Sequence, residues 1–231
     1  METAVHSQQQ VAIEQQRFIT KVYGWMSFAL AVTGAVSFMT AGSPYLLNFI
    51  FGSRFVFFGL IIGELALVFA LSALINKLTP VTATFMFLLY SVVNGLTLSV
   101  IFLVYTSASI ATTFFVTAGT FGVMSAYGYF TKTDLTKMGN ILMMALVGLI
   151  IASIVNIFFQ NPVLYWVVTF AGIIIFVGLT AYDTQKIKNI GAGVTEGSDA
   201  EKKGAIMGAL TLYLDFINLF LMLLRLFGRR R

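Results

Sequence analysis

Long apolar runs alternate with short polar connections along almost the whole chain. About 20 apolar residues, at a rise of about 1.5 Å each, cross a hydrocarbon core of roughly 30 Å. Seven runs have this length, at residues 22–42, 55–76, 81–105, 108–130, 138–159, 163–183 and 204–227. Lipid requires every backbone polar group to be bonded internally, and the short alternating strands of a barrel are absent. We therefore expect an all-α membrane protein with seven transmembrane helices.

The polar segments around these runs leave no room for a soluble domain. Residues 1–21 are polar and lack the apolar stretch of a cleaved signal peptide. The three prolines, Pro44, Pro80 and Pro162, all fall between apolar runs and punctuate the connections. We expect a polar N-terminal arm over 1–21 and a single seven-helix domain over 22–231.

The distribution of lysine and arginine predicts a cytoplasmic N-terminus, because cytoplasmic connections retain positive charge. Arg54 is the only cation in the interhelical connections of the opposite side. The C-terminal arginines break the rule if the last run crosses fully, and a re-entrant last run would restore it. We expect seven crossings. The cations assigned to the cytoplasmic side are Arg17, Lys21, Lys77, Lys132, Lys137, Lys186, Lys188, Lys202 and Lys203.

Composition excludes several classes of function. Of 231 residues, 58% are hydrophobic and 10% are charged, against roughly 25% charged in a soluble domain. The absence of cysteine excludes disulfides and thiolate metal sites, and the single histidine, His6, lies in the polar arm. The net charge of +5 lies at the ends of apolar runs, which does not favour nucleic-acid binding. We expect no tightly bound cofactor and no enzyme activity.

Three carboxyl groups lie within or at the end of apolar runs, namely Glu64, Asp183 and Asp215. A carboxylate at the centre of a transmembrane helix costs about 2.5–3.5 kcal/mol on insertion scales, so its presence indicates a polar pathway or a partner. Asp215 is the strongest candidate. Asp183 could instead form an interfacial ion pair with Lys186, and Glu64 could be a protonated structural carboxyl.

Other polar groups in apolar surroundings are candidates for a supporting role. Tyr182, Tyr213 and Asn218 flank the two aspartates. Such side chains usually form interhelical hydrogen bonds, and only a minority bind a ligand.

Two carboxyl groups held together in a low dielectric cannot both ionise readily, so they share a proton. If such a pair joins two helices, rising pH removes the shared proton and the resulting repulsion drives the helices apart. Opening then increases with pH. Carboxylates lining the path attract Ca²⁺, but Ca²⁺ takes six to eight oxygen ligands, and Asp183, Asp215 and Glu64 supply few. We therefore expect weak, leak-like passage.

Two blocks resemble the Bax inhibitor-1 family, also called the transmembrane Bax inhibitor motif proteins. They read GLTAYDTQKIK at 178–188 and ALTLYLDFINLF at 209–220. Their order and the seven-run layout fit that family over essentially the whole chain, and the sequence looks like a bacterial member. The resemblance implies a multi-pass protein of the bacterial inner membrane.

The resemblance also implies a fold with the last helix central and a pH-sensitive Ca²⁺ leak gated by a di-aspartyl pair. Asp183 and Asp215 match that pair, and Glu64 matches the family's carboxylate in the second helix. The family's latch arginine falls near Ile75, where the nearest cation is Lys77. Either Lys77 takes that place or this chain lacks the latch.

If each apolar run is one membrane crossing, the two aspartates lie at different depths in the membrane. Asp183 ends its run, whereas Asp215 lies about eleven residues, or roughly 16 Å, into the next one. Equal depth requires either that the start of the seventh run projects beyond the membrane or that the sixth helix continues past Asp183.

Two other classes of function stay open. An intramembrane aspartyl protease also uses two carboxyls to activate water, but Leu212-Tyr213-Leu214 precedes Asp215 here, where presenilin-like enzymes have Gly-x-Gly. The third class is a regulatory membrane protein that binds a protease or another membrane-protein partner through its N-terminal arm. The expected partners are otherwise the lipid bilayer, Ca²⁺ and H⁺.

Overall fold

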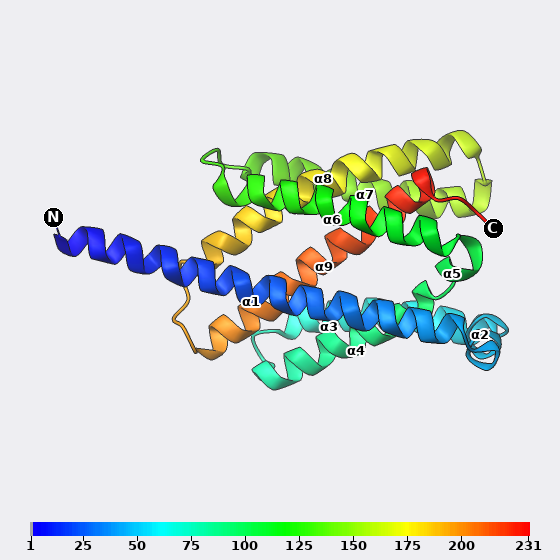
Figure 1. The fold of residues 1–231 in the computed structure, drawn as a ribbon, viewed down its shortest axis with the longest axis horizontal. Coiled ribbons are helices and arrows are strands. Elements are labelled where there is room, and N and C mark those ends of the chain that lie inside the picture. Colours follow the sequence, from blue (N-terminus) through cyan, green and yellow to red (C-terminus); the bar gives the residue numbers. More distant parts are fainter. Residues whose placement is uncertain (1) are drawn as a thin grey trace. The chain divides into compact units, whose positions relative to one another are not determined.

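The computed structural model describes the backbone of residues 2–231 and the side chains of residues 13–231. This part of the chain is helical without strands (Figure 1), as the apolar runs predict. The helices are α1 (Glu2–Ala41), α2 (Pro44–Phe51), α3 (Arg54–Leu74), α4 (Pro80–Leu98), α5 (Ile101–Val104), α6 (Ser107–Phe130), α7 (Thr136–Phe159), α8 (Pro162–Gly191) and α9 (Asp199–Phe227).

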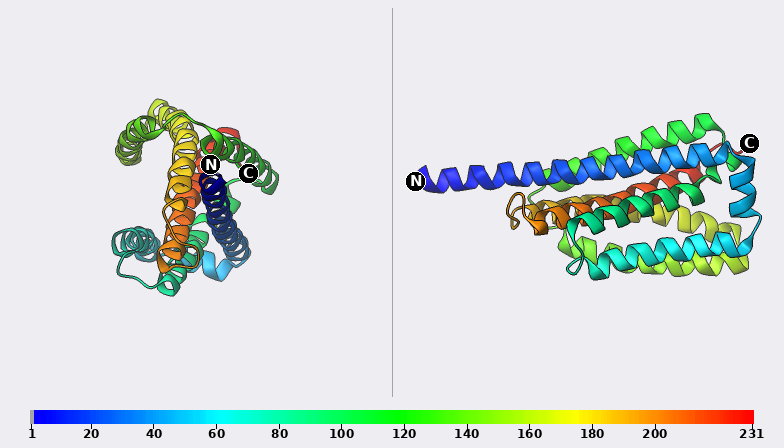
Figure 2. Two further views of the ribbon diagram at one scale, coloured as in Figure 1. Left: turned by 90° about the vertical axis from the view of Figure 1, so that its left-hand side faces the viewer. Right: turned by 90° about the horizontal axis from the view of Figure 1, so that it is seen from below.

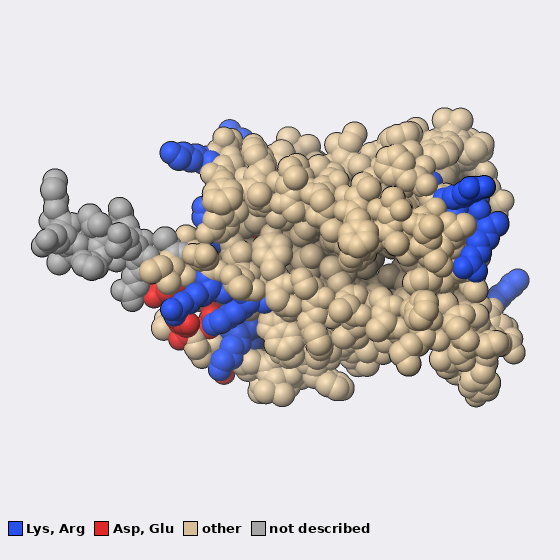
Figure 3. All heavy atoms as spheres, in the orientation of Figure 1, with Lys and Arg blue, Asp and Glu red and all other residues tan. Residues whose placement is uncertain are grey.

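Seven segments of the described chain are long and apolar enough to cross a membrane, and they correspond to the seven predicted runs. Lys and Arg side chains lie at helix ends, and the visible flanks of the helices are largely uncharged (Figure 3). The chain is therefore an all-α membrane protein. In the last span 72% of the most apolar window is buried, and no other described span exceeds 39%. The C-terminal helix is thus the most enclosed, as the family resemblance implies.

Helix boundaries follow local capping chemistry. Each of the three prolines is the first residue of a helix, where its missing N–H loses no hydrogen bond. Ser43 and Thr79 precede two of them and accept a hydrogen bond from a first-turn backbone N–H. The prolines therefore start helices α2, α4 and α8.

Two of the predicted runs differ from the structure. The third run is one span, Pro80–Val104, but it is interrupted between α4 and α5. The Ser99 N–H and hydroxyl both donate to the Leu96 carbonyl, which tightens the turn and ends α4. The sixth spanning helix, α8, continues eight residues beyond Asp183, to Gly191. This extension is one of the two ways that would bring the aspartates to equal depth.

The chain divides into two compact units. The first contains residues 1–105, 188–213 and 231, and the second contains residues 106–187 and 214–230. In the first unit α1 packs along α4, and α2 bridges the ends of α1 and α3 (Figure 2). Phe18 is buried in this unit, so the helical packing begins within the segment predicted as a polar arm.

The core of the second unit lies where α7, α8 and the C-terminal half of α9 meet. Its buried members are all apolar, and partly buried residues such as Leu142 and Tyr182 pack against them. This core lies in the same unit as both aspartates. The core residues are Leu149, Val168, Ile175, Phe176, Leu179, Leu219, Met222 and Leu223.

Candidate functional site

Asp183 of α8 and Asp215 of α9 lie in the second unit with their side chains hydrogen-bonded to each other. Both are buried, with 7% and 5% of the residue surface exposed. Two carboxyl groups can form such a bond only if one of them carries a proton. With one proton on either carboxyl group this contact is a hydrogen bond, and with none it places two like charges together.

Two glycines allow neighbouring helices to approach α8 directly before Asp183. A Cβ atom at Gly128 of α6 would overlap the backbone of Ala181, and one at Gly139 of α7 would overlap the ring of Tyr182. Only glycine fits this spacing, as at the close helix crossings of membrane proteins. The ring of Tyr182 thus packs against α7. Within the described residues its hydroxyl forms no hydrogen bond with either aspartate.

The segment of α8 after Asp183 is fixed by Gln185. Its side-chain oxygen accepts from the Leu135 N–H at 2.8 Å, and its amide donates to the Thr133 carbonyl at 2.8 Å. Both partners belong to the connection between α6 and α7. The added turns of α8 are therefore tied to the same unit, which holds Asp183 inside a helix and away from a frayed end.

Aromatic packing holds the part of α9 around Asp215. The ring of Phe216 lies 5.4 Å from that of Phe114 and 5.5 Å from that of Phe121, both on α6 and both edge-on. Asn218 donates to the Leu214 carbonyl at 2.8 Å. Asn218 thus bonds within its own helix, which is the ordinary structural role of such a residue.

One oxygen of the pair accepts no hydrogen bond from an N–H or hydroxyl group of the described residues. Asp215 Oδ2 and Ser125 Oγ are the buried side-chain oxygens of the described residues that lack such a bond. Ser125 lies on α6 one turn from Phe121 and nearly one turn from Gly128, so it belongs to the face that contacts α8 and α9. Unpaired buried oxygens are unusual, and they mark sites where a proton, water or cation acts.

Lys186 provides the positive charge nearest to the pair on its own helix. It attracts Asp183 electrostatically, while its ammonium group lies 5.9 Å from the centre of the Tyr182 ring. Neither of the ion pairs within 4 Å in residues 13–231 involves Asp183. Asp183 and Lys186 therefore do not form the interfacial ion pair that was the alternative interpretation of the sequence.

Glu64 belongs to a separate polar network in the first unit. Its carboxyl accepts hydrogen bonds from Thr97 at 2.7 Å and from Asn94 at 3.4 Å. Asn94 in turn accepts from the Tyr213 hydroxyl at 3.0 Å, which also contacts Thr33 at 2.7 Å. Tyr213 therefore joins α9 to α1 and α4, and its hydroxyl bonds to this network.

Lys77 lies in the turn after α3 with an exposed side chain. It takes part in neither of the close ion pairs of the described residues. No group of three or more acidic or histidine side chains that could hold a metal ion occurs within residues 13–231. Bound Ca²⁺ would thus depend on water for most of its ligands.

Several of these residues are not predictable from the sequence alone. Gly128, Gly139, Ser125 and Gln185 shape the surroundings of the pair, but each is unremarkable within an apolar run or at its end. Thr97 has a weak signal, because it follows Asn94 by three residues and so shares one helix face with it.

The chain is similar to bacterial membrane proteins over almost its whole length. Residues 15–231 match the family described as inhibitor of apoptosis-promoting Bax1. Inner membrane protein YbhL of Escherichia coli K12 is 55% identical over 217 residues, covering 94% of this chain and 93% of that protein. An uncharacterized protein of Borreliella burgdorferi is 44% identical over 224 residues, covering 97% of each chain.

These matches confirm the family that the two sequence blocks indicate. The family match covers both aspartates, Glu64 and all of the membrane spans except the first two residues of the first span. The chain belongs to the Bax inhibitor-1 family and is a multi-pass membrane protein.

Proposed function

We propose that this protein is a pH-sensitive Ca²⁺ leak channel in which the Asp183–Asp215 pair forms the gate. The observation that carries the proposal is the hydrogen bond between these two buried carboxyl groups, one on each of two consecutive spanning helices. A pair that shares one proton joins α8 to α9. Loss of that proton leaves two negative charges in contact, which repel each other.

The sign of the pH response follows from this geometry. At low pH the pair holds its proton, and the hydrogen bond keeps α8 and α9 together. As pH rises the proton leaves, the two carboxylates separate, and the path opens. Because one proton is released, the open population changes by at most about tenfold per pH unit.

In the open state, an oxygen atom of Asp215 can contact the Ca²⁺ ion that passes. No N–H or hydroxyl group of the described residues donates to Asp215 Oδ2, so once the two carboxylates separate this oxygen can contact a cation without breaking a further hydrogen bond. Glu64, the further carboxyl that the sequence predicts for the ion pathway, also lies within a spanning helix and can attract cations. The absence of a ligand cluster in the described residues favours transient contact with Ca²⁺ over stable binding.

Calcium flux into liposomes tests the proposal. Liposomes containing the full chain and a Ca²⁺ dye are exposed to Ca²⁺ at pH 6 and pH 8, and the leak is faster at pH 8. Asp183→Asn and Asp215→Asn each remove the titrating pair and flatten this dependence. An unchanged pH response in both variants contradicts the gate.

Asp134→Asn is the matched control. Asp134 is exposed in the connection between α6 and α7, and the hydroxyl and backbone N–H of Thr136 donate to it. These bonds lower the pKa of the Asp134 carboxyl, so it remains ionised at both pH values. The control variant is expected to keep the full pH response of the leak.

A second candidate function is regulation of a membrane-protein partner, which the description of the family as an inhibitor favours. An arm-mediated regulator loses its effect when the arm is removed, whereas a leak survives. Because Phe18 is buried in the first unit, deletion of residues 2–12 is a better test than deletion of the whole polar segment. Loss of flux in the deleted protein, with folding intact, would contradict a leak that is independent of the arm.

A further inference from the structure

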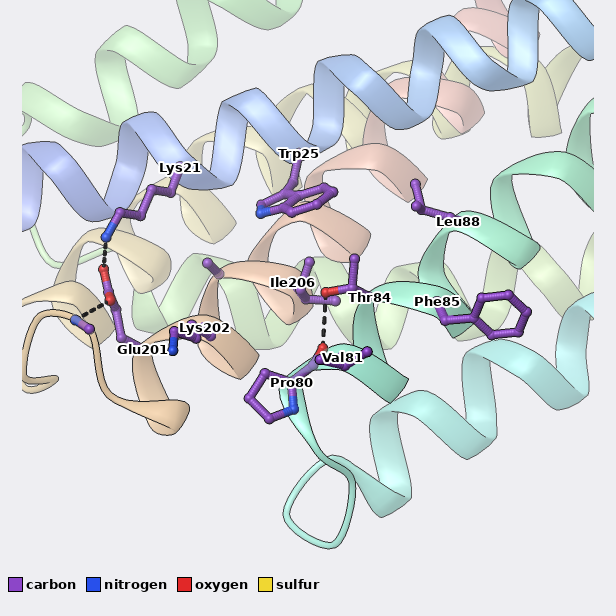
Figure 4. Close-up of a pocket in the computed structure, with 12 residues that line it drawn as sticks. Lys21, Trp25, Pro80, Val81, Thr84, Phe85, Leu88, Glu201, Lys202 and Ile206 are labelled. Atoms are coloured by element: carbon purple, nitrogen blue, oxygen red, sulfur yellow. Dashed lines mark hydrogen bonds and ion pairs between the residues drawn. The ribbon is translucent and has the colours of Figure 1, made fainter.

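We propose that the first unit binds an anionic diacyl phospholipid at the polar end of α1, α4 and α9. A pocket of about 580 Å³ lies there, and all of its lining residues belong to the first unit, whereas the aspartate pair belongs to the second (Figure 4). Its volume falls in the range of about 300–1,000 Å³ that is usual for small-molecule sites. Its apolar lining includes Trp25, Val81, Phe85, Leu88 and Ile206.

The position of the pocket indicates that its occupant comes from the bilayer. The three helices that form it are all membrane spans. Val81 and Phe85 on α4 are 78% and 65% exposed, so one wall continues onto an apolar flank. Pro80 and Gly197, which also line the pocket, lie at the helix starts and so at the level of lipid headgroups. A lipid chain can therefore enter from the side with its headgroup near the helix ends.

A second hollow of about 400 Å³ indicates two chains. It is lined by Lys21, Gly24, Trp25 and Phe28 of α1. The two hollows share Lys21 and Trp25, so they meet at the polar end of the site and separate around the Trp25 side chain. A diacyl lipid fits this arrangement, with one chain on each side of the indole and one headgroup near Lys21.

The charges at the mouth favour a phosphate. Lys21 is paired with Glu201, whose buried carboxyl also accepts from the Gly197 N–H at 2.7 Å. The negative charge of Glu201 is thus compensated inside the protein. Lys202 also lines the pocket and is exposed; it attracts Glu201 electrostatically but forms no ion pair within 4 Å with it, so its ammonium group can also contact a phosphate. Basic pockets between spanning helices bind anionic headgroups in this way.

Quenching of tryptophan fluorescence by brominated lipids measures this binding directly. The chain has two tryptophans, so Trp166→Phe leaves Trp25 as the only reporter. This variant is reconstituted in phosphatidylcholine bilayers with small amounts of brominated phosphatidylglycerol or brominated phosphatidylcholine. We expect Trp25 to show an about fivefold preference for the anionic lipid. Equal quenching by the two lipids overturns the proposal.

Lys202→Gln and Lys203→Gln form a matched pair. Both remove one positive charge at adjacent positions, but only Lys202 lines the pocket, whereas Lys203 donates to the Asn76 carbonyl at 3.4 Å. We expect Lys202→Gln to abolish the preference and Lys203→Gln to retain it. Equal loss in both variants means that general surface charge attracts the lipid, and it overturns the specific site.

Two variants that fill the hollows test whether each hollow holds an acyl chain of the lipid. Thr84→Leu places an apolar side chain in the larger hollow, and Gly24→Leu does so in the smaller one, where a Cβ atom meets no neighbour within 4 Å. We expect each to reduce quenching of Trp25 by the bound lipid about twofold, because each blocks one of two chains. Unchanged quenching in both variants rules out chains in these hollows. The lipid site is independent of the proposed leak, so either can fail alone.

Discussion

The two buried polar centres of this chain differ in how fully their oxygen atoms are hydrogen-bonded. In the first unit both oxygens of Glu64 accept hydrogen bonds, and the network continues through Asn94 to Tyr213. In the second unit Asp183 and Asp215 bond to each other, and no N–H or hydroxyl group of the described residues donates to Asp215 Oδ2. A satisfied network stabilises a fold, whereas an incompletely satisfied one can change state when a proton leaves. We therefore propose switching for the second centre and stabilisation for the first.

The largest expected effect concerns the helix approach beside the aspartate pair. Gly128→Ala places a Cβ atom on the backbone of Ala181, which cannot move aside easily. We expect a loss of about 1–3 kcal/mol in stability, together with a weakened pH response of the leak. Thermal unfolding in detergent and the liposome assay measure both.

Gly122→Ala on the same helix is the control, because a Cβ atom there meets nothing within 4 Å. Its higher helix propensity makes it neutral or slightly stabilising. If both alanine variants behave alike, close approach of α6 to α8 does not position the pair.

Glu64→Gln tests whether the first centre also attracts the ion. The amide oxygen can still accept from Thr97, so the network largely persists. Loss of the negative charge is worth about 1 kcal/mol of attraction, which predicts a roughly fivefold slower Ca²⁺ flux with the same pH dependence. An unaffected flux would make Glu64 purely structural, and a flattened pH dependence would move the gate to the first unit.

Tyr213→Phe tests the stabilising role of the network. The variant keeps the ring that packs edge-on against Phe87 and Tyr90, but it removes the hydroxyl bonded to Asn94 and Thr33. We expect a loss of about 1 kcal/mol in unfolding free energy and an unchanged pH response. A changed pH response with unchanged stability would reverse the roles of the two centres.

The smallest effect is expected for Lys77→Gln. The side chain is exposed and belongs to neither close ion pair of the described residues, so we expect a stability change within about 0.5 kcal/mol and an unaltered leak. A leak that becomes insensitive to pH in this variant would show that Lys77 serves as the latch cation.

The apolar runs predicted the spanning helices because length and hydropathy suffice for this in a bilayer. They did not predict the end of α8, since residues 184–191 are largely polar, and their helix is supported by the bonds of Gln185 to the neighbouring connection. Nor did they predict the break before α5 or the helix α2, which depend on local serine and proline capping.

The candidate site was predictable only in part, for similar reasons. Carboxyl groups in apolar runs stand out in any sequence, so Glu64, Asp183 and Asp215 were found directly. Which of them meet depends on helix packing through Gly128 and Gly139, whose neighbours are distant in sequence. The hydrogen-bond partners of Tyr213 could not be predicted either, because Thr33 and Asn94 lie on other helices.

Infrared difference spectroscopy of carboxyl groups tests the shared proton most directly. Raising the pH of the reconstituted protein should remove one protonated-carboxyl band in the wild type and in Glu64→Gln. The same change should be absent in Asp183→Asn and in Asp215→Asn, because neither variant retains the pair. A band that disappears with pH in both aspartate variants, or only when Glu64 is present, would contradict a proton held between Asp183 and Asp215.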